Sequence, residues 1–422
     1  MKRYIKLCVI FIMILNLSLG VSCQKKDEIE KSKVYIGTIN VITDERHKNQ
    51  FETAAEEFKK IHNQANINVK VSNDIRENID SLLKNKKSES DILTVNDEDL
   101  DYVLDNYKSD ILNLKSRVSS YKGSILSNKI YNATVNGNIY AMPWDVLPEL
   151  IVYRRDIFKT NDVNPDDIKT WQDYIEIGNK LKEKTGMNFM VNCKSDSNLN
   201  MILANQLGTS YFNSDKELDF KSGKWTKIFD LEKELYNNNL IVNVDSDDKL
   251  LSMAKDGDIL TFIATPYLAY DLMNTMKSDD IWGVMKLPAF EPGGNESVSV
   301  GGTNLVINKN SDNVDLSSEF IKFILTDDKL QIDLLNNYGR IPVYKNAYYF
   351  KDINRFVNYY NNNIWKLFID SQMQSFNIKY TKYFPEVKDK INAILSPDNL
   401  KSKDKKDLVS DITKAIEKVV VQ

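Results

Sequence analysis

The chain has 422 residues, a formal net charge of −4 and a charged fraction of 27%. A nearly balanced charge without a basic stripe argues against nucleic acid as a partner. The length allows about two or three domains, and an apolar fraction of 42% is that of a globular protein with a packed core.

The N-terminal residues predict a targeting segment followed by an anchor. A positively charged start leads into the apolar run Leu7–Leu19, and small residues then end the segment at Cys23. This arrangement resembles a lipoprotein processing site, with a signal peptide over 1–22, a lipidated Cys23 and a polar tether over 23–33. Gly20 stands where such sites usually have leucine, so an ordinary cleaved signal is the alternative.

Cysteine and histidine usage predicts neither a disulfide nor a metal site in the mature chain. Cys8 is lost with the signal and Cys23 is used for the lipid, which leaves Cys193 alone. His47 and His62 lie too far apart to ligate one ion from a single helix, and no cysteine lies near them. We therefore expect no metal and no cofactor.

The first part of the mature chain alternates apolar strands with helices. The predicted strands and helices are Val34–Thr38, a helix with its cap at Thr43-Asp44, Ile67–Val71, Ile75–Lys86, Asp91–Val95 and Glu98–Tyr107. This order predicts a parallel sheet covered by helices on both faces. Ligands bind at the carboxyl ends of such strands, which makes Asn40 and Asn96 candidate ligand contacts. The alternative is that these polar residues only cap the helices that follow.

A short segment in the middle of the chain predicts a crossover between two lobes. The turn pair Asn136-Gly137 precedes a strand that stops at Pro143, and Trp144 and Asp145 follow at once. A tryptophan beside a carboxylate is what a sugar site requires, namely a flat apolar face and an acceptor for hydroxyl groups. The alternative for Trp144 is packing within the hinge.

The remaining chain is mainly helical. Thr170 begins a capping box, a strand over 258–264 leads to Pro266 and Tyr267, and Trp282 opens a second crossover strand as a core residue. The predicted helices are 171–181, 198–207, 225–236, 266–276, 316–325, 329–336 and several more towards residue 422. Tyr338–Pro342 predicts a third crossing.

The order of these motifs resembles the extracellular solute-binding proteins of bacterial ABC importers, in their carbohydrate-binding, maltose-binding-protein-like branch (family 1). The positions that match are Gly137, Tyr140, Pro143, Tyr153, Asp156, Phe158, Thr170 and Trp171. The resemblance implies an α/β, two-lobed, periplasmic-binding-protein-like fold of type II, with a hinge and a ligand cleft between the lobes. The crossings predict one lobe over 32–141 and 287–337, and a second over 142–286 and 338–422.

The resemblance also implies a lipid-anchored protein on the outer face of a Gram-positive cell membrane, a monomer that delivers a sugar or oligosaccharide to permease subunits of an ABC transporter. Tyr267 lies where the family often has a sugar-stacking aromatic, and small residues at Gly301–Asn304 let the backbone approach a ligand. The expected ligand contacts are Trp144, Asp145, Tyr267, Gly301, Gly302, Thr303, Asn304, Arg340, Asn40 and Asn96. If the stacking ring lies elsewhere, Trp365, Tyr380 and Tyr383 are the next candidates.

Two other functions stay open. Related branches bind polyamines or other small polar solutes, and an acidic cleft would favour such a cation. A surface-anchored glycosidase would need two carboxylates at a fixed separation. We expect no enzyme, because the sequence has no Gly-x-Ser-x-Gly, no His-Glu-x-x-His and no paired cysteine and histidine.

Overall fold

The computed structural model describes residues 34–72, 74–84, 90–193, 198–213, 215, 217–276, 281–378 and 380–420. The predicted signal peptide, Cys23 and the tether lie outside these residues. The chain forms one unit over Met1–Tyr35 and another over Ile36–Gln422, and the second unit holds every sheet that follows. Among the described residues, no helix is long and apolar enough to cross a membrane.

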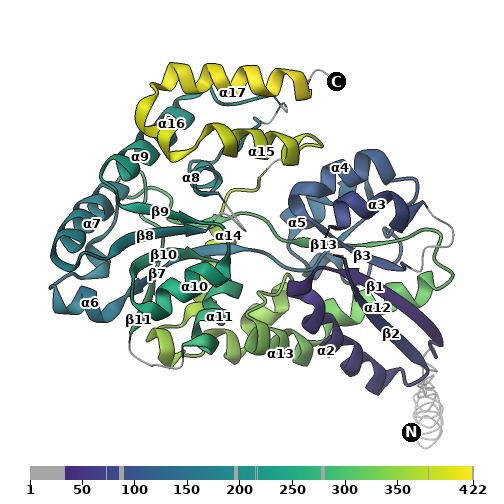
Figure 1. The fold of residues 1–422 in the computed structure, drawn as a ribbon. Coiled ribbons are helices and arrows are strands. Elements are labelled where there is room, and N and C mark those ends of the chain that lie inside the picture. Colours follow the sequence, from purple (N-terminus) through teal and green to yellow (C-terminus); the bar gives the residue numbers. More distant parts are fainter. Residues whose placement is uncertain are drawn as a thin grey trace, which may run out of the picture. The chain divides into compact units, whose positions relative to one another are not determined.

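The first of the two large sheets has five strands (Figure 1). Its strands, in spatial order, are β2 (Ala65–Val71), β1 (Gly37–Thr43), β3 (Ile92–Asn96), β13 (Thr303–Ile307) and β6 (Met142–Pro143). β1 runs parallel to β2 and β3, whereas β13 is antiparallel to β3 and β6. The predicted parallel β-α-β unit is confirmed, with helices α2 (Glu45–Ile61), α3 (Ile75–Leu83) and α4 (Asp97–Tyr107) following its strands.

The first strand lies later than its prediction. Val34 and Ile36 are exposed, at 63% and 65%, and pairing with β2 begins only at Gly37 and continues to Thr43. The apolar run that suggested a buried strand therefore includes solvent-exposed residues, while the polar Asn40 and Thr43 are inside the strand. This shift moves the carboxyl end of β1 to Thr43, directly before the helix cap Asp44.

A second sheet has six strands. Its main order is β11 (Trp282–Met285), β7 (Pro148–Arg154), β10 (Ile259–Ala264), β8 (Asn188–Cys193) and β9 (Ile241–Val244), and β12 (Val298–Ser299) pairs with β7. The helices that accompany it are α6 (Arg155–Thr160), α7 (Trp171–Thr185), α8 (Leu199–Gln206), α9 (Gly223–Asn237), α10 (Asp247–Asp256) and α11 (Pro266–Thr275). The predicted capping box of α7 is confirmed, because Thr170 and Asp173 cap each other's backbone.

The rest of the chain supplies connections and helices. These are α5 (Ser127–Asn132), the hairpin β4 (Thr134–Val135) and β5 (Asn138–Ile139), α12 (Val314–Thr326), α13 (Asp328–Tyr338), α14 (Ile364–Gln374), α15 (Phe384–Ile394), α16 (Pro397–Ser402), α17 (Lys405–Val420), and short 3₁₀ helices at Lys122–Ser124, Pro165–Asp167, Lys345–Tyr349, Lys351–Asn354 and Asn358–Tyr360. Asn136 and Gly137 both have positive φ, at 51° and 73°, which confirms the predicted hairpin turn.

The chain passes repeatedly between the two sheets. β6 still belongs to the first sheet, and β12 pairs with the second. The first lobe was predicted to end at residue 141, but pairing with the first sheet continues through Met142 and Pro143. The second segment of that lobe was predicted to begin at residue 287, but the chain rejoins the first sheet only at β13. Apolar side chains of α15 and α17 belong to the same core cluster as those of the second sheet, together with the predicted core residue Trp171. Trp282 is fully buried, as predicted.

Candidate ligand-binding site

A cavity of about 150 Å³ lies where strand ends of both sheets meet. The end of β1, the end of β3, the loop after β6, the N-terminus of α11 and the start of β13 all contribute to its wall. The residues that line it are Asp44, Arg46, His47, Asn96, Asp97, Glu98, Asp145, Leu147, Asn198, Met201, Tyr267, Val300, Gly301, Gly302, Thr303, Tyr380, Phe384 and Lys388. We call this space the central pocket.

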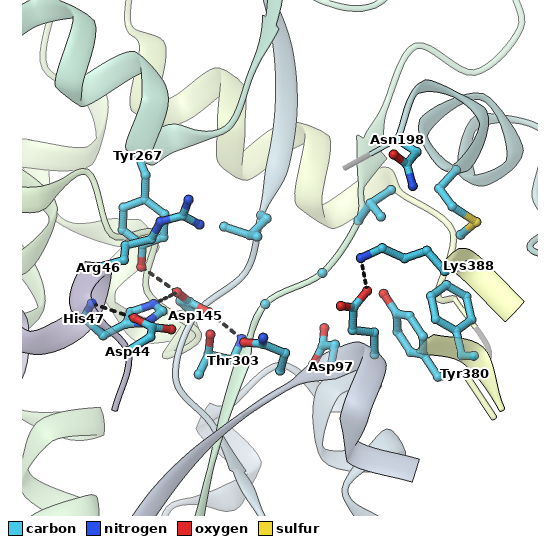
Figure 2. A pocket seen from close by; sticks show the side chains of 18 residues that line it. Asp44, Arg46, His47, Asp97, Asp145, Asn198, Tyr267, Thr303, Tyr380 and Lys388 are labelled. Atoms are coloured by element: carbon cyan, nitrogen blue, oxygen red, sulfur yellow. Dashed lines mark hydrogen bonds and ion pairs between the residues drawn. The ribbon is translucent and has the colours of Figure 1, made fainter. Parts of the chain in front are cut away.

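Asp145 is the polar centre of one wall of the central pocket. Its Oδ2 accepts hydrogen bonds from the Tyr267 hydroxyl at 2.5 Å and from Nε2 of His47 at 3.0 Å. Its Oδ1 accepts the backbone N–H of Thr303 at 2.7 Å. Figure 2 shows these partners converging on the carboxylate from different elements. One buried side chain thus joins α2, the loop after β6, α11 and β13.

His47 is held in the charged form by two carboxylates. Its Nδ1 lies 2.8 Å from Asp44 Oδ1, in addition to the contact with Asp145. Burial alone lowers the pKa of His47, but the hydrogen bonds and negative charges of Asp145 and Asp44 outweigh it and raise the pKa to about 9. Since the folded pKa exceeds the ordinary 6.5, this stabilisation is complete below pH 6.5 and is lost as the pH rises through about 9.

The Asp145 carboxylate is correspondingly kept ionised. Burial acts to raise its pKa, yet the contacts with His47 and Tyr267, together with the positive charge of Arg340, lower the pKa to about 2. Burial and the neighbouring Asp145 charge raise the pKa of Tyr267, so its hydroxyl keeps its proton and donates it. At neutral pH this wall therefore consists of the carboxylates of Asp145 and Asp44, an imidazolium and a neutral phenol.

The opposite wall is built from α4, α15 and the segment that leads into β13. Figure 2 shows Asp97, Tyr380, Lys388 and Asn198 gathered there, apart from the Asp145 group. Asp97 forms an ion pair with Lys129 and accepts a hydrogen bond from Asn304 Nδ2 at 2.8 Å. These bonds fix the Asp97 carboxylate at the amino end of α4.

At Gly302, the backbone that leads into β13 lies close to the backbone of the loop that carries Asp145. The residue has a φ of +131°, and a Cβ added there would lie 2.7 Å from the backbone oxygen of Asp145. No side chain fits at that distance, so glycine is required for β13 to approach the loop that carries Asp145. The close approach is what allows the N–H of Thr303 to reach the carboxylate.

Every charged side chain that lines the central pocket has an oppositely charged partner. Asp44 and Asp145 share His47, and the other pairs are Asp97–Lys129, Glu98–Lys388 and Arg46–Asp247. The Glu98–Lys388 distance is 2.6 Å and the Arg46–Asp247 distance is 3.4 Å. Each charged group of the pocket thus lies against an opposite charge, although Asp44 and Asp145 share one imidazolium. Within the described residues, no group of three or more His, Cys, Asp or Glu is placed to hold a metal ion.

Comparison with known proteins identifies the family. The family model "Bacterial extracellular solute-binding protein" matches residues 53–358. The chain belongs to this family. The resemblance inferred from the sequence motifs is therefore confirmed.

Individual members of the family are similar over most of this chain. The arabinooligosaccharide-binding protein of Bacillus subtilis is 26% identical over 282 residues, which is 64% of this chain and 65% of that protein. The arabinooligosaccharide-binding protein of Halalkalibacterium halodurans is 23% identical over 279 residues, which is 63% of this chain and 62% of that protein. The matched region thus spans a little under two thirds of both curated relatives.

Solved structures show the same fold. T. maritima MalE3 with maltose bound has a TM-score of 0.76 at 17% identity, covering 90% of this chain and 99% of that one. The GacH receptor of Streptomyces glaucescens has a TM-score of 0.77 at 16% identity, covering 92% of this chain and 99% of that one. The predicted two-lobed, periplasmic-binding-protein-like α/β fold of type II is confirmed.

For this solute-binding protein, the structure brings six of the ten predicted contacts together. The six that line the central pocket are Asp145, Tyr267, Gly301, Gly302, Thr303 and Asn96. The four that do not line it are Trp144, Asn304, Arg340 and Asn40. Tyr380, a reserve candidate, also lines the pocket, whereas Trp365 is fully buried elsewhere.

Trp144 packs in the core instead of facing the pocket. Its side chain has no exposed surface, and its ring stacks on Phe51 at a centroid distance of 4.6 Å. The Arg340 guanidinium lies 3.6 Å from the centre of the indole, and the indole N–H donates to Gln50 Oε1 at 3.2 Å. The expected sugar-stacking role of Trp144 is replaced by a packing role, because neighbouring side chains already cover the ring.

Arg340 and Asn304 support the site from behind. Arg340 is fully buried, donates to Gln331 Oε1 at 3.1 Å and also donates to the backbone oxygen of Trp144. Asn304 holds Asp97, as described above. Asn40 is displaced for another reason: it lies in the middle of β1, where it accepts a hydrogen bond from Asn68, because the strand ends at Thr43, five residues later than predicted.

The same shift explains the residues that sequence reasoning missed. Asp44 and His47 were placed on a helix but not in the site, although they follow the true end of β1. Asp44 caps α2 and touches His47 with the same oxygen. The helix cap at Asp44 is the sequence feature that could have identified these two residues. A cap directly after a parallel strand marks the carboxyl end of that strand, where ligands bind. Lys388, on helix α15, carries no such local signal.

A substitution at Trp144 separates packing from ligand contact. We expect Trp144→Ala to lower the free energy of unfolding by about 3–5 kcal/mol, the usual cost of removing a buried tryptophan. Urea unfolding monitored by circular dichroism measures this value. The control is Tyr349→Ala, which removes an aromatic that is 86% exposed and should change stability by less than about 0.5 kcal/mol. Equal stability of the two variants would contradict the packing role.

Proposed function

We propose that this solute-binding protein binds an uncharged sugar or oligosaccharide in the central pocket. The observation that supports this most strongly is the pairing of every charge that lines the pocket. A charged solute would have to displace one member of an existing pair, whereas sugar hydroxyls only add hydrogen bonds to carboxylates and amides already in place. Tyr267 also lines the pocket beside these groups, with the Arg46 guanidinium 5.6 Å from the centre of its ring.

The relatives agree with this ligand class. Two are arabinooligosaccharide-binding proteins, a third is the lactose-binding protein of Rhizobium radiobacter, and one structural neighbour holds lacto-N-biose. Their names supply the sugars to test first, namely arabino-, malto- and galacto-oligosaccharides. A polyamine is disfavoured because each carboxylate of the pocket already has a positively charged partner. A glycosidase is disfavoured by membership of a family of binding proteins.

We further propose that binding is coupled to closure of two lobes at the crossings near residues 142, 287 and 338. The ion pair Arg46–Asp247 joins α2 to α10, and the pair Glu98–Lys388 joins α4 to α15. Both pairs connect a helix next to the first sheet with a helix packed beside the second. Such contacts stabilise the closed arrangement of a hinge, and the closed monomer would deliver its sugar to ABC permease subunits.

The location that fits this function is the outer face of the cell membrane. We propose that the chain is cut before Cys23, lipidated there and tethered by 23–33, as in a Gram-positive cell. The charged and apolar leader that precedes Cys23 supports this. A single cysteine at the start of a polar tether suits a domain that must reach a permease.

The binding proposal predicts a thermal shift with sugars and a loss of affinity at Tyr267. With the tether-free domain, we expect at least one sugar of the panel to raise the melting temperature and spermidine to leave it unchanged. We expect Tyr267→Ala to weaken that sugar about thirtyfold, or about 2 kcal/mol, in calorimetry. Tyr349→Ala is the matched control and should bind normally.

Two results would argue against this function. If spermidine and not a sugar stabilises the domain, the ligand is a cation. If a sugar is consumed catalytically, as seen by product formation during long incubation, the protein is an enzyme and the pocket is an active site.

The anchor proposal predicts that Cys23→Ala abolishes membrane attachment. In cells, we expect the unmodified chain to partition into the detergent phase and the variant to be released into the medium. Cys193→Ala is the control, because this cysteine lies within the fold on β8. A Cys23→Ala variant that still partitions with detergent would show that another segment holds the protein to the membrane.

A further inference from the structure

Lys129 is a buried lysine that lies outside the central pocket and touches one of its walls. It is on α5, its side chain is 7% exposed, and it does not belong to the lining of the pocket. A lysine is seldom buried without a partner, because its ammonium group loses its hydration. The partner of Lys129 is Asp97, which lines the opposite wall of the pocket (Figure 2).

Two oxygen atoms accept hydrogen bonds from this ammonium group. Lys129 Nζ donates to Asp97 Oδ2 and, at 2.8 Å, to the backbone oxygen of Gly301. The backbone at Gly302 is equally close, since a Cβ added there would lie 2.8 Å from Lys129 Nζ and 3.3 Å from Asp97 Oδ2. A carboxylate and a carbonyl that converge on one point form a site for a primary ammonium ion. The chain fills this site with its own lysine.

The Asp97 carboxylate is also held from its other side. Its Oδ1 accepts a hydrogen bond from Asn304 Nδ2 at 2.8 Å, and the backbone N–H of Asp97 donates to the oxygen of Gly302 at 2.8 Å. A carboxylate at the wall of a pocket attracts positively charged solutes, most strongly where burial limits screening by water and salt. Lys129 opposes this attraction from outside the pocket.

We propose that Lys129 is a positioning residue that makes the central pocket select against cationic solutes. It occupies the ammonium site at Asp97 and Gly301, so that a solute amine finds no free carboxylate there, whereas a hydroxyl group can still donate to Asp97. This inference rests on the proposed binding of an uncharged sugar. It goes further in assigning the exclusion of cations to one residue that the solute does not touch.

The origin of the two partners sets this ion pair apart from the others of the pocket. Asp97 begins α4 directly after β3, and α5 packs beside β6, so both partners belong to the first sheet. The Glu98–Lys388 pair instead joins α4 to α15, and its side chains are 30% and 21% exposed. Separation of the proposed lobes breaks that pair and leaves Asp97–Lys129 intact. Asp97 is therefore already neutralised when a solute enters the open cleft.

The alternative is that Lys129 only stabilises the fold. The two roles differ in what happens at Asp97 once the lysine is removed. If Lys129 shields the carboxylate, its removal exposes a negative charge to the pocket, and a cation should bind there. If Lys129 serves packing alone, its removal lowers stability and leaves the choice of solute unchanged.

The test measures spermidine binding by the purified protein and its variants, in calorimetry and by thermal shift, with the sugar panel titrated alongside. Lys129→Met removes the ammonium group and keeps an unbranched side chain of similar length. Lys129→Met combined with Asp97→Asn removes both charges. Lys122→Met is the matched control, because Lys122 is exposed and its replacement changes the net charge by the same amount.

We expect Lys129→Met to bind spermidine at least about tenfold more tightly than the unmodified protein or Lys122→Met does. This gain should be lost in the double variant, since spermidine would have no carboxylate at residue 97 to pair with. Added salt should reduce the gain, because the attraction is between charges.

A second measurement covers a loss of stability, since removing one partner of a buried ion pair is strongly destabilising. If Lys129→Met is unfolded in buffer, spermidine should restore its melting transition. Trp144→Ala is the control for this measurement, because it removes a buried ring without changing a charge, and spermidine should not restore it.

The role of Lys129 is overturned if Lys129→Met, folded or unfolded in buffer, gains nothing from spermidine. Sugar binding by the unmodified protein would then leave the proposed function standing. Spermidine binding that persists in the double variant also overturns the role, because the cation would not be paired with Asp97. If the unmodified protein binds spermidine as tightly as Lys129→Met does, both the role of Lys129 and the proposed uncharged ligand are wrong.

Discussion

The structure of the site depends on one buried carboxylate. Asp145 has almost no contact with solvent, and an ionised carboxyl group in such a position is stable only when donors surround it. The hydroxyl of Tyr267, the imidazolium of His47 and the N–H of Thr303 meet this requirement. Because the three donors come from separate parts of the chain, satisfying Asp145 brings those parts together. Gly302 is required for the same reason, since only glycine lets β13 come this close to the Asp145 backbone.

The pairing of charges around Asp145 also bears on the kind of solute that the pocket binds. A second carboxylate, Asp44, holds the other side of the His47 ring, and the remaining charges of the pocket are paired as well. The walls are therefore polar, and each of their charges lies against an opposite charge, which favours solutes that bind through many hydrogen bonds over solutes that carry charge. We propose that the paired charges of this chain select the chemical class of solute that the pocket accepts.

Sequence patterns predicted most strands and helices, because period and caps are local properties. They also identified Asp145 and Tyr267 as pocket residues. Asp145 follows a strand that stops at Pro143, and Tyr267 follows Pro266 in the first turn of a helix, and both patterns can be recognised in the sequence. Two failures have physical causes. In strand β1 the polar residues Thr38, Asn40 and Thr43 alternate with or follow the buried Ile39, Val41 and Ile42, so its end was placed five residues early and Asp44 and His47 were missed. Trp144 was expected at the ligand, but the charge of Arg340 is placed against its ring, a contact between residues almost two hundred positions apart that no local pattern reveals.

The protonation state of His47 tests the central role of Asp145 most directly. The chain has only two histidines, so an NMR titration of the ring protons resolves His47 with His62 as an internal reference. We predict that His47 stays protonated up to about pH 9, and that its pKa falls in an Asp145→Asn variant, which removes one of the two carboxylates. A His47 that loses its proton at or below its ordinary value of 6.5 would contradict the account, because the two carboxylates would then not be holding an imidazolium between them.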